Sequence, residues 1–134
     1  MKYAMFIGRW QPFHKGHRWL IDQKLKKEKP VLICIRDIEP DKYNPLTAQE
    51  VMWMLADVFE KEIGMVRIKI IPDIESINYG RGVGYEINEH APPDNIKTIS
   101  ATEIREKINN DESWKDMVDS GAIKFLEKKF GQDQ

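Results

Sequence analysis

Short apolar runs alternate with helix-like segments through the first half of the chain, and this alternation restricts the possible folds more than any other feature. Tyr3–Ile7 and Val31–Ile35 have the pattern of strands, the first buried on both faces, and Val66–Ile71 is a third strand ending at Pro72. The segments between them, 16–28 and 47–62, predict amphipathic helices. Strands alternating with helices predict an α/β fold with a mostly parallel sheet.

The second half is less regular. Asp73–Asn95 contains three glycines and two adjacent prolines, and it predicts a long loop with one short strand around Val83–Ile87. Ile96–Ile99 predicts another short strand, followed by a helix from Ser100 to about Asn109. Apolar residues at helical spacing then complete the core, and a frayed tail is expected at the end: Trp114, Met117, Val118, Ile123, Phe125, Leu126 and the tail Gly131–Gln134.

We therefore expect residues 1–134 to form a single Rossmann-like domain, with the sheet flanked by helices. Right-handed crossovers put every loop from a strand to a helix at the carboxyl edge of a parallel sheet. Ligands of open α/β sheets bind in the crevice at that edge. The two motifs described below both lie in such predicted loops.

Composition excludes several classes of protein. The chain has 21 basic and 22 acidic side chains, and this near-neutral balance argues against nucleic acid as the main partner. No uncharged apolar run approaches the roughly 18 residues of a membrane-spanning helix. The one cysteine, Cys34, excludes an internal disulfide and a multi-cysteine zinc site. These observations predict a cytoplasmic protein.

The first motif joins the first predicted strand to the first predicted helix. His14 and His17 are three positions apart at the helix start, so both can point to the same side. The free N–H groups of the helix start, two imidazole donors and the Arg9 guanidinium would together attract an anion, and Gly16 would let it approach closely. The alternatives are two half-exposed surface histidines, or a metal site that also uses Cys34, His90 and a carboxylate.

The second motif precedes the helix that begins near residue 101. Ser100 can cap this helix while the amides of Ala101 and Thr102 remain available to an anion. Arg105 lies one turn further on and can reach back over the same place. The alternative is an ordinary capping box with a solvent-facing arginine. Two helix starts on one sheet edge would form a double phosphate clamp.

Both motifs resemble signatures of the nucleotidyltransferase superfamily of His-x-Gly-His enzymes. The first segment, Gly8-Arg9-Trp10-Gln11-Pro12-Phe13-His14-Lys15-Gly16-His17, is most similar to that of nicotinamide-mononucleotide adenylyltransferases, and the second resembles Ile-Ser-x-Thr-x-x-Arg. The resemblance implies that the catalytic residues are His14, His17 and Arg105. It implies nucleotide contacts from these residues: Gly8, Arg9, Trp10, Phe13, Gly16, Ser100 and Thr102.

Acceptor-binding residues are expected in two other segments. Asn44-Pro45-Leu46-Thr47 resembles a segment of the adenylyltransferases that often follows a lysine, and Lys42 lies one position earlier than that lysine. The relatives usually have a further βα unit between Pro72 and Ser100, where this chain has a glycine-rich segment. That segment either wraps the acceptor, through Tyr79, Arg81 and Tyr85, or is an irregular surface loop.

The function implied is transfer of a nucleoside monophosphate, AMP by preference, from a triphosphate to a phosphate-bearing acceptor such as nicotinamide mononucleotide, with release of pyrophosphate. Mg²⁺ would bind mainly to phosphate oxygens and water, so no metal-ligating residues are expected. The expected partners are ATP or CTP and a phosphomonoester, without nucleic acid or membrane, and a homo-oligomer is left open. The alternatives are a cytidylyltransferase that uses CTP and a polyol or amino-alcohol phosphate, and a nucleotide-binding module without turnover.

Overall fold

A parallel three-stranded sheet forms the centre of the structure, a computed structural model that describes residues 1–131. The strand order is β1–β2–β3, and the strands are Ala4–Gly8, Val31–Asp37 and Val66–Pro72. The predicted α/β class with a parallel sheet is confirmed. Of the predicted tail Gly131–Gln134, all but Gly131 lies outside the described residues.

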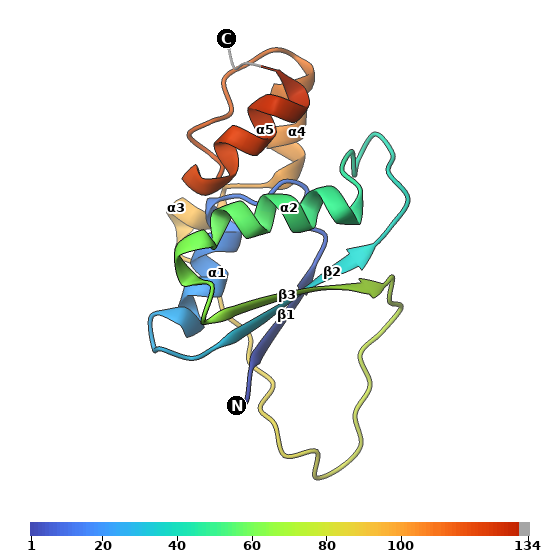
Figure 1. The fold of residues 1–134 in the computed structure, drawn as a ribbon, viewed down its shortest axis with the longest axis vertical. Coiled ribbons are helices and arrows are strands. Elements are labelled where there is room, and N and C mark those ends of the chain that lie inside the picture. Colours follow the sequence, from blue (N-terminus) through green and yellow to red (C-terminus); the bar gives the residue numbers. More distant parts are fainter. Residues whose placement is uncertain (132–134) are drawn as a thin grey trace.

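The helices lie on one side of the sheet (Figure 1). They are α1 (Lys15–Leu25), α2 (Ala48–Val58), α3 (Asp94–Lys97), α4 (Ala101–Asn109) and α5 (Ile123–Phe130), with short 3-10 turns η1 (Glu60–Glu62) and η2 (Ser120–Ala122). The crossovers through α1 and α2 connect strands in the sequential order 1-2-3. Two right-handed crossovers that advance in one direction put their helices on the same face.

The two faces of the sheet differ because of this arrangement. Phe6 pairs with Ile33, and both side chains are buried in the core beneath the helices. Met5 is the next residue along β1 and points to the opposite face, where its side chain is 57% exposed. The expectation that the first strand is buried on both faces is therefore wrong, because no helix covers the second face within residues 1–131.

The segment between β3 and α4 also differs from the prediction. Residues 73–93 contain no strand and form a long excursion away from the helices (Figure 1), so the strand expected around 83–87 is wrong. The strand expected at Ile96–Ile99 is wrong as well, because these residues form α3 and the turn after it. The Lys97 N–H donates to the Pro93 carbonyl oxygen (2.8 Å), which closes a helical turn directly after Pro92-Pro93. Pro93, which cannot donate to a strand, precedes that turn as its cap.

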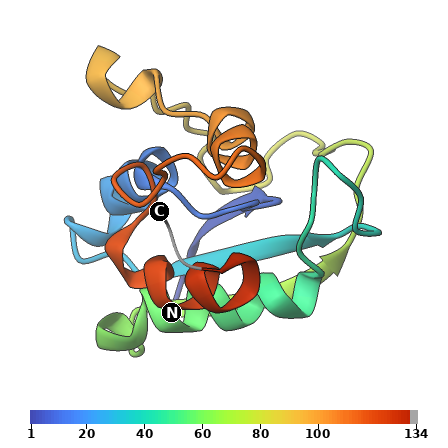
Figure 2. The same cartoon turned by 90° about the horizontal axis from the view of Figure 1, so that it is seen from above.

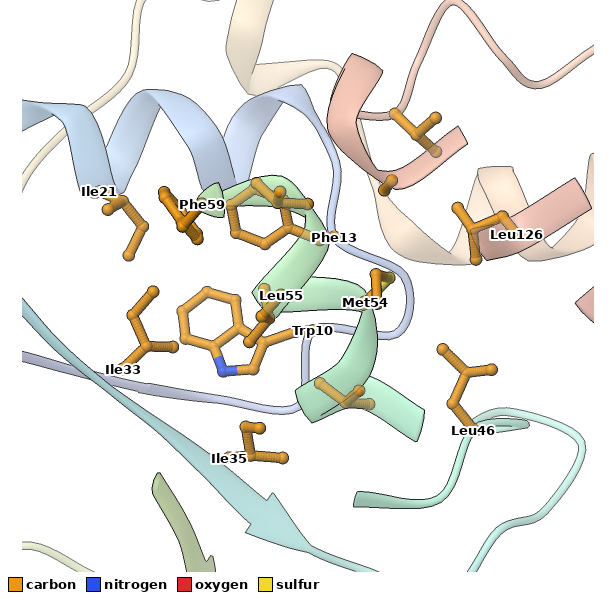
Figure 3. Close-up of a cluster of buried hydrophobic side chains, with 14 of the residues drawn as sticks. Trp10, Phe13, Ile21, Ile33, Ile35, Leu46, Met54, Leu55, Phe59 and Leu126 are labelled. Atoms are coloured by element: carbon orange, nitrogen blue, oxygen red, sulfur yellow. The ribbon is translucent and has the colours of Figure 1, made fainter. Parts of the chain in front are cut away.

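Aromatic side chains from the loop between β1 and α1 contribute to the hydrophobic core. Trp10 and Phe13 project from this loop into a cluster with residues of β2 and α2 (Figure 3). Leu126 of α5 joins the same cluster, so the C-terminal helix packs against α2. Trp114 is buried there too, as the sequence predicted. Within residues 1–131, the helices are all too short or too polar to cross a membrane.

Gly121 allows η2 to lie close to α2. Figure 2 shows the C-terminal segment, in red, beside the green α2. A Cβ at Gly121 would lie 2.8 Å from the Val58 Cα, which is backbone and cannot rotate away. We predict that Gly121→Ala lowers the free energy of unfolding by about 1–3 kcal/mol, through overpacking. Urea denaturation measures this change.

The matched control is Gly64→Ala, because a Cβ at Gly64 meets no atom within 4 Å. This variant is expected to change the free energy of unfolding by less than about 0.5 kcal/mol. Equal effects of the two substitutions would contradict the close contact between η2 and α2.

Candidate active site

Two histidines cap the start of α1 through reciprocal hydrogen bonds. His14 Nδ1 accepts from the backbone N–H groups of Gly16 (3.0 Å) and His17 (3.3 Å), and His17 Nδ1 accepts from the His14 N–H (3.2 Å). The rings are stacked, with centroids 3.6 Å apart. Because both Nδ1 atoms accept, the proton of each neutral ring lies on Nε2. Each ring is left with one N–H donor, which points away from the helix backbone.

Burial keeps both imidazoles neutral at pH 7. The His14 side chain is only 7% exposed, and its burial lowers its pKa from 6.5 to about 4. Burial also lowers the pKa of His17 well below 6.5, and the neighbouring His14 lowers it further. The pair therefore offers hydrogen-bond donors without formal positive charge. His14 is therefore not a half-exposed surface histidine, whereas His17 is intermediate in solvent exposure.

The backbone N–H groups at the start of α1 are already paired. The Lys15 N–H donates to the Met117 carbonyl oxygen (3.1 Å), and the Arg18 N–H donates to the His14 carbonyl oxygen (3.0 Å). The N–H groups between them are the two that His14 Nδ1 accepts. The anion site expected from free amides at this helix start is therefore not formed. Any anion here would meet the imidazole Nε2–H groups instead.

Four of the residues predicted to bind nucleotide contact the histidine pair or leave room for it and its neighbours. The rings of Trp10 and Phe13 are buried and pack against His17, with centroids 5.0 and 5.6 Å from its ring. A Cβ at Gly8 would lie 2.9 Å from the Trp10 indole, and one at Gly16 would lie 2.8 Å from His14 Cε1. The two glycines therefore make room for side chains of the protein itself, and the two aromatic rings hold His17 in place.

Trp10 marks the point where the chain leaves β1 in a strained conformation. Its φ angle is +55°, which is rare for a bulky residue, and its indole N–H donates to the Cys34 carbonyl oxygen (3.2 Å) in β2. Such positions cost about 1–3 kcal/mol and concentrate at functional sites. Burial of the indole over the sheet holds this conformation.

Gln11 is a structural residue of the site to which the sequence analysis assigned no role. Its buried amide makes two hydrogen bonds with Leu46: Gln11 Nε2 donates to the Leu46 carbonyl oxygen (2.8 Å), and the Leu46 N–H donates to Gln11 Oε1 (2.9 Å). Its own carbonyl oxygen accepts from Arg105 Nη1 (2.7 Å). The residue thereby joins three segments that are distant in the sequence. In the sequence, the indication of such a role is an amide side chain placed between the aromatic residues Trp10 and Phe13.

The second motif lies beside the first, as predicted. Ser100 Oγ accepts from the Glu103 N–H (3.2 Å) and caps α4. The N–H groups of Ala101 and Thr102 have no hydrogen-bond partner among the described residues. Arg105 Nη2 donates to Thr102 Oγ1 (3.3 Å) while Nη1 reaches Gln11. Arg105 therefore bridges two segments that are 94 positions apart.

Charges of both signs surround the Arg105 guanidinium. Partial burial is the main cause that lowers its pKa, the Asp41 carboxylate raises it, and the Arg9 charge lowers it. Asp41 is held in a turn by hydrogen bonds that its carboxylate accepts from the N–H groups of Tyr43 (2.8 Å) and Asn44 (2.7 Å). Glu106 of α4 also raises the pKa of Arg105, so two arginines and two carboxylates interact where the motifs meet.

The predicted acceptor residues are not all brought to this place. Lys42 lines a cavity together with Gln11 and Arg105. Tyr79, Arg81 and Tyr85 are exposed on the long excursion between β3 and α3, which extends away from the helices (Figure 1). Across residues 1–131, no hydrogen bond joins these three side chains to either motif. In this conformation the segment has the form of the second alternative, an irregular surface loop.

The described residues do not form a protein metal cage. No group of three or more His, Cys, Asp or Glu side chains in residues 1–131 is placed to hold a metal ion. Cys34 is buried in β2, and its backbone carbonyl is used by Trp10. The alternative metal site of His14, His17, Cys34 and His90 is therefore not assembled.

The chain is similar to curated archaeal proteins over nearly its whole length. It is 27% identical to the nicotinamide-nucleotide adenylyltransferase of Methanococcus aeolicus, covering 98% of this chain and 91% of that protein. Identity to the protein of the same name from Sulfurisphaera tokodaii is 26%, covering 98% and 94%. Identity to nicotinamide-nucleotide adenylyltransferase 1 of Sulfolobus acidocaldarius is 28%, covering 92% and 87%. No protein-family model matches the chain.

A solved structure has the same fold. The bifunctional NMN adenylyltransferase/ADP ribose pyrophosphatase from Francisella tularensis superposes with a TM-score of 0.67 at 23% identity. The match covers 98% of this chain and 52% of that one, so this chain spans about half the length of the bifunctional protein. The predicted Rossmann-like fold is confirmed by this match, and the resemblance to the nucleotidyltransferase superfamily is confirmed by the curated relatives.

The buried neutral histidines predict a specific acid sensitivity. In the unfolded chain His14 binds its proton near pH 6.5, whereas in the folded protein it does so only near pH 4. The unfolded state therefore binds more protons between these values, and the free energy of unfolding falls as the pH falls from 6.5 to 4. We expect a loss of about 2–3 kcal/mol from His14 over this range, measured by urea denaturation at several pH values.

His14→Asn is the matched variant, because an asparagine can cap the helix but does not titrate. Carboxylates with a lowered pKa, such as Asp41, contribute acid sensitivity to both proteins and cancel in the comparison. The variant should lose less stability than the wild type between pH 6.5 and pH 4. Parallel curves for the two proteins would contradict the neutral buried state of His14.

Proposed function

We propose that this protein is an adenylyltransferase that transfers AMP from ATP to a mononucleotide acceptor of the nicotinamide mononucleotide type and releases pyrophosphate. The observation that carries the proposal is the bridge made by Arg105, which joins the histidine motif to the free amides at the start of α4. The names of the archaeal relatives support this reaction and this acceptor. A single domain over residues 1–134 would be sufficient for it.

The reaction needs no protein nucleophile. An oxygen of the acceptor phosphate attacks the α-phosphorus of ATP, a new P–O bond forms, and the bond between the α-phosphorus and the β-bridging oxygen breaks. Pyrophosphate carries away the electron pair of the broken bond. Catalysis of such a transfer consists of positioning the reactants and stabilising the charge that develops on phosphate oxygens.

The residues of the two motifs would divide this work. The Nε2–H groups of His14 and His17 would donate to oxygens of the α-phosphate as charge develops. The free N–H groups of Ala101 and Thr102 would bind the β- and γ-phosphates at the start of α4. Arg105, with Arg9 nearby, would pair with the same phosphates and stabilise the leaving pyrophosphate.

Mg²⁺ fits this site only as an ion carried by the triphosphate. Asp41 and Glu106 are the carboxylates whose charges act on Arg105, and Asp41 Oδ1 already accepts from the N–H groups of its own turn. Within residues 1–131, no three His, Cys, Asp or Glu side chains are grouped to hold a metal ion. Mg²⁺ commonly binds through substrate phosphates and water, and when bound it would neutralise phosphate charge. A related structure contains AMP and a manganese ion, which supports a divalent cation in this family of folds.

The assay that tests the proposal measures pyrophosphate release with each of the four nucleoside triphosphates. The acceptors are nicotinamide mononucleotide, glycerol 3-phosphate and phosphoethanolamine. The expected result is release with ATP and nicotinamide mononucleotide only. Release with CTP and an alcohol phosphate would replace the proposal by a cytidylyltransferase, and binding of ATP without release would leave a nucleotide-binding module.

Removing the His17 donor should reduce turnover much more than binding. A donor that acts on developing charge contributes mainly in the transition state, and loss of one costs about 10²–10³ in rate for comparable oxyanion donors. We therefore expect His17→Ala to lower kcat by about that factor while the Kd for ATP changes little. Steady-state kinetics and calorimetry measure the two quantities.

His17→Gln separates catalysis from helix capping. A glutamine at this position can still accept the hydrogen bond from the N–H of the cap residue, so the start of α1 is retained. We expect the stability of this variant to stay close to that of the wild type, while kcat falls as in His17→Ala. A variant with a normal kcat and a raised KM would remove His17 from the transition state.

Arg105 should distinguish the triphosphate from the monophosphate. Only the longer ligand reaches the start of α4, and a charge-assisted hydrogen bond contributes about 1.5–3 kcal/mol. Arg105→Ala should therefore weaken ATP binding by about 10–100-fold and AMP binding much less, as measured by calorimetry. Equal losses for both ligands would show that Arg105 does not bind the outer phosphates.

A further inference from the structure

A cavity of about 140 Å³ lies on the far side of Arg105 from the start of α4. Its walls come from the loop before α1, the loop before α2, the second half of α4 and the end of α5. The lining residues are Gln11, Pro12, Lys42, Pro45, Leu46, Arg105, Ile108, Asn109 and Phe130. The roles proposed above involve neither the last turn of α4 nor the end of α5, which form part of these walls.

The cavity has an apolar interior with polar groups around it. Pro12, Leu46 and Phe130 supply flat or branched apolar surfaces. Arg105 and Lys42 supply positive charge, and Asn109 supplies an amide that can both donate and accept. Small-molecule sites are typically apolar clefts in which a few polar groups set the orientation of the ligand.

The size of the cavity limits what can enter. An apolar cavity of about 150 Å³ holds one benzene molecule, so this cavity accommodates one six-membered ring. The volume therefore suits the monocyclic base of the proposed acceptor, which is smaller than the two fused rings of adenine.

We propose that this cavity binds the six-membered ring of the acceptor mononucleotide, with Asn109 hydrogen-bonded to a polar substituent of the ring. Lys42, at the rim, pairs with the acceptor phosphate, and Arg105 lies between the acceptor and the triphosphate. Arg105 and Asn109 are one helical turn apart on the same face of α4, which orients both toward one ligand. This inference deepens the proposed function and rests on it for the identity of the ligand as an acceptor.

The same placement makes α4 part of both halves of the site. Its first turn presents free amides to the triphosphate, and its last turn presents Asn109 to the acceptor ring. Gln11 holds the loop at Leu46, which forms the opposite wall of the cavity. The acceptor phosphate would then lie near the phosphates held by α4 and Arg105.

The test is direct binding of nicotinamide mononucleotide, with ribose 5-phosphate as a ligand that has the sugar and phosphate but no nicotinamide ring. Asn109→Ala should weaken binding of nicotinamide mononucleotide by about 3–10-fold, the usual effect of one neutral hydrogen bond. Ile108→Trp should fill the cavity and weaken the same ligand by at least tenfold. Both variants should bind ribose 5-phosphate and ATP as the wild type does, as measured by calorimetry.

The matched control is Asn110→Ala, which removes the same side chain one position further along, outside the cavity lining. It should leave all three affinities unchanged. Thermal unfolding checks that each variant folds. If Ile108→Trp does not fold, the result for Asn109→Ala alone decides the test. Unchanged binding of nicotinamide mononucleotide in Asn109→Ala, or a loss confined to ATP, overturns the proposal.

Parallel measurement of pyrophosphate release separates the two proposals. Ring binding that depends on Asn109, without pyrophosphate release, overturns the proposed function and leaves the ring site standing. Release of pyrophosphate that is insensitive to Asn109 and Ile108, with unchanged affinities, overturns the ring site and leaves the function standing.

Discussion

The reciprocal cap formed by His14 and His17 is the interaction on which the rest of the site depends. It pairs the backbone amides of Gly16 and His17 with His14 Nδ1, so these amides need neither water nor a ligand. It also fixes both rings with their protons on Nε2. Desolvation lowers the pKa of both stacked rings, so they remain neutral and no charge has to be desolvated. The surrounding glycines and aromatic residues are explained by the space and support that this stack requires.

The contact between Arg105 and the Gln11 carbonyl oxygen is the second constraint, because it brings the two motifs together. The guanidinium is the only part of α4 that makes a side-chain hydrogen bond to the first motif within the described residues. The other terminal nitrogen donates to Thr102 Oγ1, and the charges of Arg9, Asp41 and Glu106 act on the same guanidinium. Asp41 offsets part of the positive charge while it shapes the turn that carries Lys42.

The one-sided sheet explains where the site can lie. With α1 and α2 on the same face, the loops at the carboxyl edge and the later helices α4 and α5 assemble above that face (Figure 1). The segment 73–93 leaves from β3 and stays outside this assembly. The proposed acceptor pocket is the cavity between α4, α5 and the loop before α2.

The sequence by itself determined the local structure: the three strands, the cap of α2 by Thr47 and Glu50, and the cap of α4 by Ser100. These features depend on periodicity and on hydrogen bonds between residues three or four positions apart, which a sequence displays directly. Only the tertiary structure decided that His14 and His17 are neutral, that Gln11 joins three segments, and that residues 96–99 form a helical turn. Burial, pKa shifts and strand pairing depend on neighbours distant in the chain, and no local pattern records those neighbours.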